Sequence, residues 1–253
     1  MRILSWSAAI LAVGGSAAVG SMGCASLPER PSSLELRLTG SVDTVAISPV
    51  GASADALSDA EAQVKFEGRA IERLEAAGIR VVRADTFDRF WQRYADDVGG
   101  VYDVSTGAVD PVRFEIVRDA VYRELVEVED VDAVLVLRVV VVDTPGVDPR
   151  PGRVGRSPEV CGQRVAMYWP GGFSGQSGEF PSLVRSACLS AELFGSGGNV
   201  IFSRLWPLES IETYDRQSRA VRPRGERLAN DRVLDAAVAS VLRPLIEANA
   251  PAK

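Results

Sequence analysis

Three cysteines, two lysines and no histidine limit the chemistry that this 253-residue chain can perform. The absence of histidine removes Ser-His-Asp and Cys-His nucleophile activation, histidine general bases and histidine metal ligands. With Lys65 and Lys253 as the only lysines, a Walker-type phosphate loop or a lysine Schiff base is also hard to build. We therefore expect a protein that is not an enzyme and that binds no metal and no cofactor.

Two glycine-rich loops superficially suggest catalysis or nucleotide binding. In the loop GGFSGQSGE, Ser174 and Ser177 lack the flanking glycines of a nucleophile elbow, and no histidine exists to activate them. The loop GSGGN, residues 195–199, lies between two strand-like runs rather than between a strand and a helix. We interpret it as the turn of a β-hairpin.

Carboxylates cluster in two places, and carboxylate oxygens are the ligands that calcium prefers. Neither cluster has the D-x-D-x-D-G spacing that places ligands around one ion, so we interpret both as solvated helix ends and turns. A histidine-free hydrolase that works with two carboxylates is a distant alternative. The first cluster is Asp96, Asp97, Asp103 and Asp110, and the second is Glu127, Glu129, Asp130 and Asp132.

The amino terminus has the features of an export signal. Arg2 is followed by an apolar stretch of small residues with no acidic residue, and the stretch ends at Cys24. Gly23 and Cys24 resemble the end of the lipobox of bacterial lipoproteins, although Ser21 and Met22 depart from that motif. Ordinary signal cleavage after Ala25, or an uncleaved anchor, is the alternative.

The lipobox resemblance implies a division of the amino-terminal region. Residues 1–23 would be the signal peptide, Cys24 would carry the acyl chains, palmitate among them, and residues 24–41 would be the tether to the membrane. The residue after the cysteine is Ala25 rather than Asp. By the same resemblance, this implies an outer membrane lipoprotein that faces the periplasm of the cell envelope.

The other two cysteines, Cys161 and Cys188, form an even pair once Cys24 is set aside. Disulfides persist in exported proteins, and this one would close a loop of about 28 residues. In the chain-entropy model it would stabilise the fold by about 3 to 4 kcal/mol. The alternative is that Cys161 and Cys188 are two unrelated buried thiols. Non-reducing mass mapping would then find both thiols free.

The run DAVLVLRVVVVD, residues 132–143, is the most apolar stretch after the signal and predicts a central strand. Only Arg138 interrupts its apolar core, so we expect burial on both faces. Before it, the patterns predict a strand at 43–51, a helix capped by Ser58 and Glu61, a strand at 79–84, an aromatic helix from Phe87 to Tyr94 and a helix that begins at Asp110 and Pro111. The apolar face of the first helix should consist of Val64, Gly68, Ile71 and Leu74. After it, we expect a hairpin at 182–212 and a terminal helix that Asn230 caps and that Pro244 should kink or end.

These elements predict an α/β (α+β) fold with a mixed β-sheet. The amino-terminal half is a βαβ unit, and an antiparallel hairpin and a carboxy-terminal helix complete one domain over residues 42–250. A long loop rich in proline and glycine, residues 144–162, interrupts it. Aromatic residues near glycine and proline suggest a recognition loop. They are Tyr102, Trp169, Phe173, Phe180 and Trp206.

The element order resembles that of periplasmic α/β lipoproteins. These include the curli-export lipoprotein, the lipoprotein activators of peptidoglycan synthases and the amino-terminal domain of TolB. The resemblance rests on Cys24, on VAISPV at 45–50, on GIRVV at 78–82 and on DAVLVLRV at 132–139. It implies a fold and a compartment, and it assigns no functional residue.

We therefore expect a membrane-anchored lipoprotein that acts as a non-enzymatic binding or assembly factor with an envelope protein as its partner. An oligomeric subunit of an envelope secretion or transport complex is the alternative. The net charge of −6 disfavours a nucleic-acid partner, because neutralising phosphates requires clustered cations.

Overall fold

A computed structural model of the chain describes residues 42–145, 159–161, 163–164, 183–214, 219–221 and 227–250. The predicted signal peptide, Cys24 and the tether lie outside the described residues. So do Trp169, Phe173, Phe180 and most of the loop 144–162.

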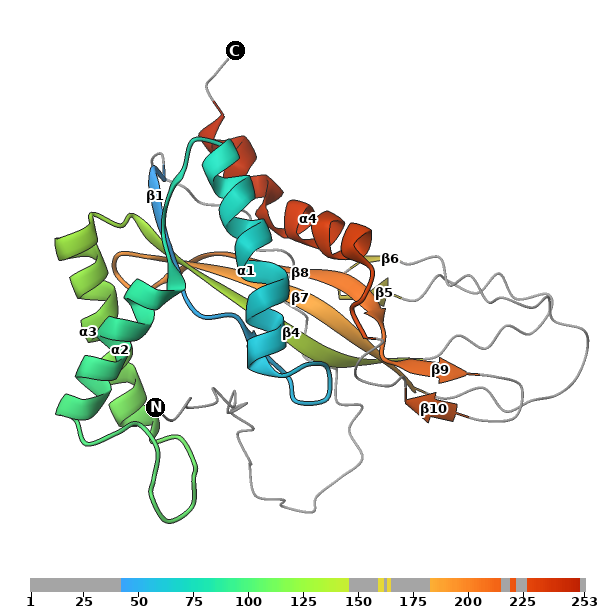
Figure 1. Cartoon of the computed structure of the whole chain (residues 1–253), viewed down its shortest axis with the longest axis horizontal. Helices are drawn as coiled ribbons and strands as arrows, with labels where there is room; N and C mark the ends of the chain where they lie inside the picture. The colour runs from blue at the N-terminus through green and yellow to red at the C-terminus, as the bar shows by residue number, and fades with distance from the viewer. Residues whose placement is uncertain are drawn as a thin grey trace, which may run out of the picture.

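Six strands form one open mixed sheet in the order β3-β1-β4-β7-β8, with β2 also paired to β4 (Figure 1). β1 runs parallel to β3 and to β4, whereas β4, β7 and β8 are antiparallel, as the sequence predicts. The bounds are Thr44–Ile47 for β1, Gly51–Ala52 for β2, Arg80–Val82 for β3, Ala133–Pro145 for β4, Leu183–Gly195 for β7 and Val200–Ser210 for β8. Two small hairpins pair β5 (Glu159–Val160) with β6 (Gln163–Arg164) and β9 (Glu212–Tyr214) with β10 (Arg219–Val221).

The four helices of the described residues cover the two faces of the sheet (Figure 1). α1 (Asp59–Ala76) and α4 (Asp231–Asn249) pack side by side on one face, and α2 (Ala84–Asp97) and α3 (Pro111–Glu129) pack on the other. None of the described helices is both long and apolar enough to cross a membrane.

The predicted helix starts are confirmed. Ser58 and Glu61 form a reciprocal capping box at α1, and the carboxylate of Asp110 accepts the first free N–H groups of α3. Asn230 caps α4, which continues past Pro244 to its last residue. Of the two expected effects of Pro244, a kink or an end, the end does not occur, because the packing of α4 on the sheet holds the last turns in place despite the lost hydrogen bond.

The predicted face of α1 is only partly correct. Phe66, Ala70 and Leu74 face the core and are fully buried, whereas Val64 is 81% exposed. Apart from its chain neighbours and the backbone of its own helix, no described atom lies within 4 Å of the position where a side chain on Gly68 would begin. The helix is rotated so that the larger Phe66 fills the core in place of Val64.

The central strand β4 is buried on both faces over only part of its length. Its residues 133–137 are all buried, between the α1 and α4 cluster and the α2 and α3 cluster. Arg138 is exposed, so the expectation of a strand covered on both faces along its whole length is wrong. The α2 and α3 layer ends before this residue, which places its charge in water and avoids the cost of burying it.

Cys161 and Cys188 form the predicted disulfide, with their Cα atoms 6.3 Å apart. Cys188 is fully buried on β7, and Val140 and Val142 of β4 pack beside the bridge. The disulfide thus fastens the turn of the β5–β6 hairpin to the sheet face that α2 and α3 leave uncovered.

Candidate binding surface

The loop between α2 and α3, residues 98–110, projects from the end of the helix pair (Figure 1). Val104 in this loop is 100% exposed, and Val112 and Ile116 in the first two turns of α3 are 66% and 53% exposed. Tyr102 is 41% exposed. We call these four residues the end surface. Exposed apolar side chains on one loop and on the helix that follows it are candidates for an interaction site.

Hydrogen bonds hold the loop in one conformation. The carboxylate of Asp103 accepts hydrogen bonds from the backbone N–H groups of Ser105 and Thr106, at 2.9 and 2.8 Å, and from both of their hydroxyls. The bond from the Ser105 hydroxyl, followed by those from Thr106, lowers the pKa of Asp103 to about 2. Gly107 completes the turn with a φ of 68°, which glycine adopts without strain.

The base of the loop is tied to the core. The backbone N–H of Asp110 donates to the carbonyl of Val101 at 2.9 Å, and Val101 is buried. The ring of Phe114 meets the ring of Trp91 edge to face at 5.1 Å. The predicted aromatic stripe of α2 is thus a packing surface that fixes the loop, and a fixed loop loses little entropy on binding.

A polar stripe of α1 lies at the carboxyl ends of the parallel strands. Asp59, Gln63 and Glu67, spaced four residues apart, each accept a hydrogen bond from a backbone N–H. The donors are Ala52 at 2.8 Å, Val50 at 2.6 Å and Ala84 at 3.4 Å, respectively. The stripe fastens the segment after β1 and the start of α2 to α1.

Carboxylates crowd together beside this stripe. Burial, and then the charges of Glu67 and Asp85, raise the pKa of Asp88 to about 6, and its Oδ1 atom is buried without a hydrogen bond. Burial also raises the pKa of Asp59, and burial with the Asp59 charge raises that of Tyr102. Among the described residues, no three His, Cys, Asp or Glu side chains are grouped to hold a metal ion.

A shallow cleft of about 280 Å³ lies between α3 and the turn that joins β7 to β8. Asp119, Arg123 and Glu127 of α3 line it together with the glycines of the turn. Charges of both signs alternate along this wall, so the cleft selects neither an anion nor a cation.

The predicted site residues lie in separate places. Tyr102 belongs to the end surface, whereas Trp206 lies on β8 against the cluster formed by α1 and α4, with the Arg204 guanidinium 5.7 Å from the centre of one of its rings. The other three predicted aromatics and Cys24 are outside the described residues. Sequence reasoning missed Val112 and Ile116, although their spacing of four residues outside the buried stripe of α3 was a signal for them.

The predicted acidic clusters act locally. Asp103 and Asp110 hold the loop and the start of α3. One oxygen of Asp132 accepts the backbone N–H groups of Asp43 and Thr44, both at 2.8 Å, and so fixes the start of β1 against the start of β4.

Comparisons with known proteins find only distant structural similarity. No protein-family model matches the chain, and no curated protein matches it. The chain is similar to the lipoprotein GNA1162 of Neisseria meningitidis, with 15% identity and a TM-score of 0.35 over 81% of this chain and 98% of that one. It is also similar to the PelC dodecamer of Paraburkholderia phytofirmans, with 15% identity and a TM-score of 0.30 over 81% and 87% of the two chains. A third similar structure is a neuraminyllactose-binding hemagglutinin homolog of Helicobacter pylori, with 12% identity and a TM-score of 0.30 over 81% of this chain and 83% of that one. A bacterial lipoprotein is therefore among the similar structures, at a level that supports no functional argument.

Proposed function

We propose that the protein is an exported, membrane-anchored lipoprotein that acts as a non-enzymatic binding or assembly factor in the cell envelope. The end surface would bind its protein partner. The observation that carries this proposal is the full exposure of Val104 at the tip of a turn held by Asp103. A stiff loop with an apolar tip binds a partner at little entropic cost and has no evident role in stabilising the chain that bears it.

The position of the amino-terminal chain supports this role. Val42 is clamped by Asn249 at the end of α4: its N–H donates to the Asn249 side-chain oxygen at 3.0 Å, and the Asn249 amide donates to its carbonyl at 2.5 Å. α3 runs 19 residues, about 28 Å, from the end surface back to this region. A domain tethered through Val42 would therefore present the end surface at the opposite end of α3 from the tether.

The anchor itself is argued from the sequence. Arg2, the apolar stretch and Cys24 support export and acylation. Ala25 after the cysteine, by resemblance to lipoprotein sorting, supports an outer membrane protein that faces the periplasm. Replacing Cys24 with Ser should abolish labelling by an acyl-chain analogue and release the protein from the membrane fraction. Continued labelling would refute the assignment.

Site-specific photocrosslinking in intact envelopes tests the binding role. A crosslinker at position 104 or 112 should capture one abundant protein. Val128 is the matched control, because it is a 63% exposed valine near the other end of α3. The same products from position 128, or none from 104, would contradict the proposal. Release of fragments from purified cell wall would instead favour the carboxylate-dependent hydrolase.

An oligomeric subunit of an envelope secretion or transport complex is the second candidate, and one observation favours it. β8 ends the sheet, and no described strand pairs with its outer side. Val200 and Leu205 on this strand are 39% and 38% exposed. Such an edge can pair with another chain. A monomeric mass for the detergent-extracted protein would exclude this alternative.

A further inference from the structure

The net charge of the chain is concentrated on the two helices that carry the end surface. Residues 84–129, from the start of α2 to the end of α3, contain 11 of the 34 acidic residues and 5 of the 28 basic residues. Their formal net charge is −6, which equals that of the whole chain, because the other 23 acidic and 23 basic residues cancel. The negative potential of the protein therefore arises mainly from the layer formed by α2 and α3.

Ion pairs within this layer do not remove the excess. Three of its five arginines already pair with carboxylates of the same layer, which leaves eight carboxylates and two arginines. The pairs are Arg93 with Glu124, Arg113 with Asp110 and Arg118 with Asp119. The remaining carboxylates are available to basic groups of another molecule.

Two of the remaining carboxylates lie next to the apolar side chains of the end surface. Asp103 is exposed and directly precedes Val104 in the loop. Hydrogen bonds from its own loop, that from the Ser105 hydroxyl first, lower the pKa of Asp103 to about 2, so it is ionised at neutral pH. Glu115 is exposed on α3, one residue before Ile116. The apolar side chains are thus interleaved with negative charge.

The end of α2 carries two more carboxylates, at a position that the helix itself does not favour. Asp96 and Asp97 are exposed in its last turn, which contains no basic residue. Because partial negative charge gathers at the C-terminus of a helix, acidic residues there do not stabilise it. The side chain of Arg113 donates to the carbonyl of Gly100 at 3.4 Å, which places the end of α2 against the start of α3. We call Asp96, Asp97, Asp103 and Glu115 the acidic group.

We propose that the partner of the end surface is a protein that presents apolar side chains together with lysine or arginine. This inference rests on the proposed binding role of the end surface and adds the chemistry of the partner. Apolar side chains of the partner would cover those of the end surface, and its basic side chains would face the acidic group. Opposite charges of this kind speed encounter and fix the register of a complex. An anionic lipid surface would be repelled by the same carboxylates.

Mapping the crosslinked product tests this chemistry. A photocrosslinker at position 104 of the full chain, in isolated envelopes, joins the end surface to its partner, and mass spectrometry identifies the attached segment. That segment should contain apolar residues and more basic than acidic residues. A segment with a net negative charge would overturn this inference and leave the binding role in place. The absence of any product would overturn both.

Neutralising part of the acidic group measures its contribution. Asp97→Asn combined with Glu115→Gln removes two negative charges and should lower the yield of the product from position 104 by about threefold or more. Raising the salt concentration to about 1 M should lower the yield from the parent chain in the same way, because the Debye length falls to about 3 Å. A yield that neither change alters would overturn the proposal.

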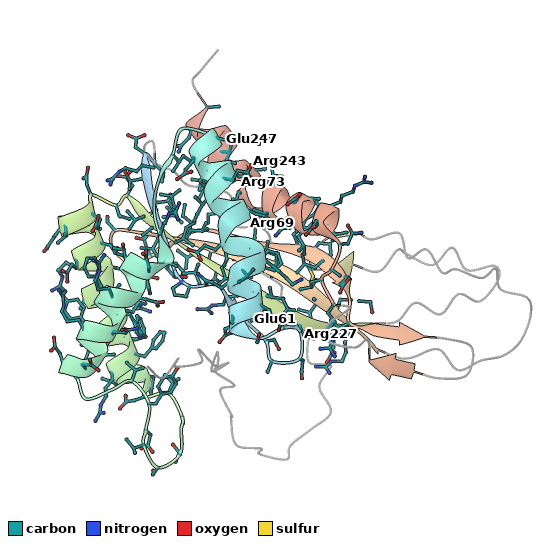
Figure 2. All side chains as sticks on the ribbon, in the orientation of Figure 1. Glu61, Arg69, Arg73, Arg227, Arg243 and Glu247 are labelled. Atoms are coloured by element: carbon teal, nitrogen blue, oxygen red, sulfur yellow. A yellow bond between two sulfur atoms is a disulfide. The ribbon has the colours of Figure 1, made fainter. Side chains whose placement is uncertain are left out.

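Glu72→Gln combined with Glu75→Gln is the matched control. It removes the same charge from exposed residues of α1, on the other face of the sheet, where Figure 2 shows Arg69 and Arg73 between α1 and α4. The product from position 104 should keep its yield in this variant. Equal losses in the two double variants would show that only the total charge matters, and would overturn the assignment to the end surface.

Two other occupants of the end surface would give different results. A product from position 104 with the mass of two chains would show that a second copy covers the surface. A blue shift of a fluorophore at position 104, when the full chain is bound to phosphatidylglycerol vesicles, would show contact with lipid. Either result would overturn the proposal, whereas a heterologous product and an unshifted fluorophore support it.

Discussion

The two faces of the sheet are covered to different extents. On one face, α1 and α4 bury a cluster that extends from β3 to β8. On the other face, α2 and α3 bury a smaller cluster that ends at Val136, and Arg138 beyond it is exposed. The comparison suggests a division of labour. We therefore expect the larger cluster to contribute more to stability and the smaller one to position the end surface.

Two neighbouring residues of β4 test this difference most directly. Leu137 faces α1 and α4 and is fully buried, so Leu137→Ala should destabilise the protein by about 2 to 5 kcal/mol. Arg138→Ala should change the stability by less than about 0.5 kcal/mol, since the Arg138 side chain is exposed. Urea unfolding of both variants measures the contrast. Equal decreases in the free energy of unfolding of the two variants would show that the two faces of the sheet contribute equally to stability.

The disulfide is the next largest effect, and it tests how the uncovered part of the second face is held. Replacing both Cys161 and Cys188 with Ser should lower the free energy of unfolding by about 2 to 4 kcal/mol, because the bridge constrains the unfolded chain. Unfolding with and without reductant should reproduce the effect in the parent protein but not in the double variant. If reductant left the unfolding midpoint of the parent protein unchanged, packing alone would hold Cys188 in place.

Asp88 tests the contact between the two layers. Its raised pKa of about 6 means that its proton stabilises the fold fully below about pH 4, and that this contribution is lost as the pH rises through about 6. Asp88→Asn keeps a neutral side chain, so it should be more stable than the parent at pH 7 by about 1 to 2 kcal/mol, allowing for solvent screening at this half-exposed site.

At pH 4 the advantage of Asp88→Asn should disappear. Asp235→Asn, at an exposed carboxylate paired with Arg69 on the other face, is the control and should show no such gain. A pH-independent difference between Asp88→Asn and the parent would indicate that the asparagine acts through new hydrogen bonds.

Local signals in the sequence predicted the elements, but not how they are covered. Ser58 with Glu61, and Asp110 with Pro111, mark helix starts through bonds within a few residues, and both are confirmed. The exposure of Arg138 depends on where a distant helix pair ends over the sheet, which no local pattern encodes. Val64 and Phe66 show a second limit, because small or apolar residues fill two adjacent faces of α1 and only the packed sheet decides between them.

For the candidate site, too, the sequence did not indicate which residues would be exposed. The sequence pointed to Tyr102 as an aromatic near glycines, yet the end surface also contains Val104, Val112 and Ile116. The exposure of Val112 and Ile116 follows from the way that α3 lies on the sheet. The raised pKa of Asp88 also depends on tertiary structure, because Glu67, one of the two carboxylates that raise it, belongs to another helix.

The smallest global effect is expected at Asp103, where the change should be local to the end surface. Asp103→Ala removes the acceptor of four hydrogen bonds, so the amides of Ser105 and Thr106 should exchange faster while the midpoint of urea unfolding stays unchanged. Because the pKa of Asp103 is lowered to about 2, the parent loop should keep its protection until the pH falls below about 3. Crosslinking from position 104 should weaken in Asp103→Ala, although Val104 itself is unchanged. Undiminished crosslinking would mean that the partner recognises the apolar side chains without needing a preformed loop, and the end surface would then resemble an adaptable patch more than a rigid one.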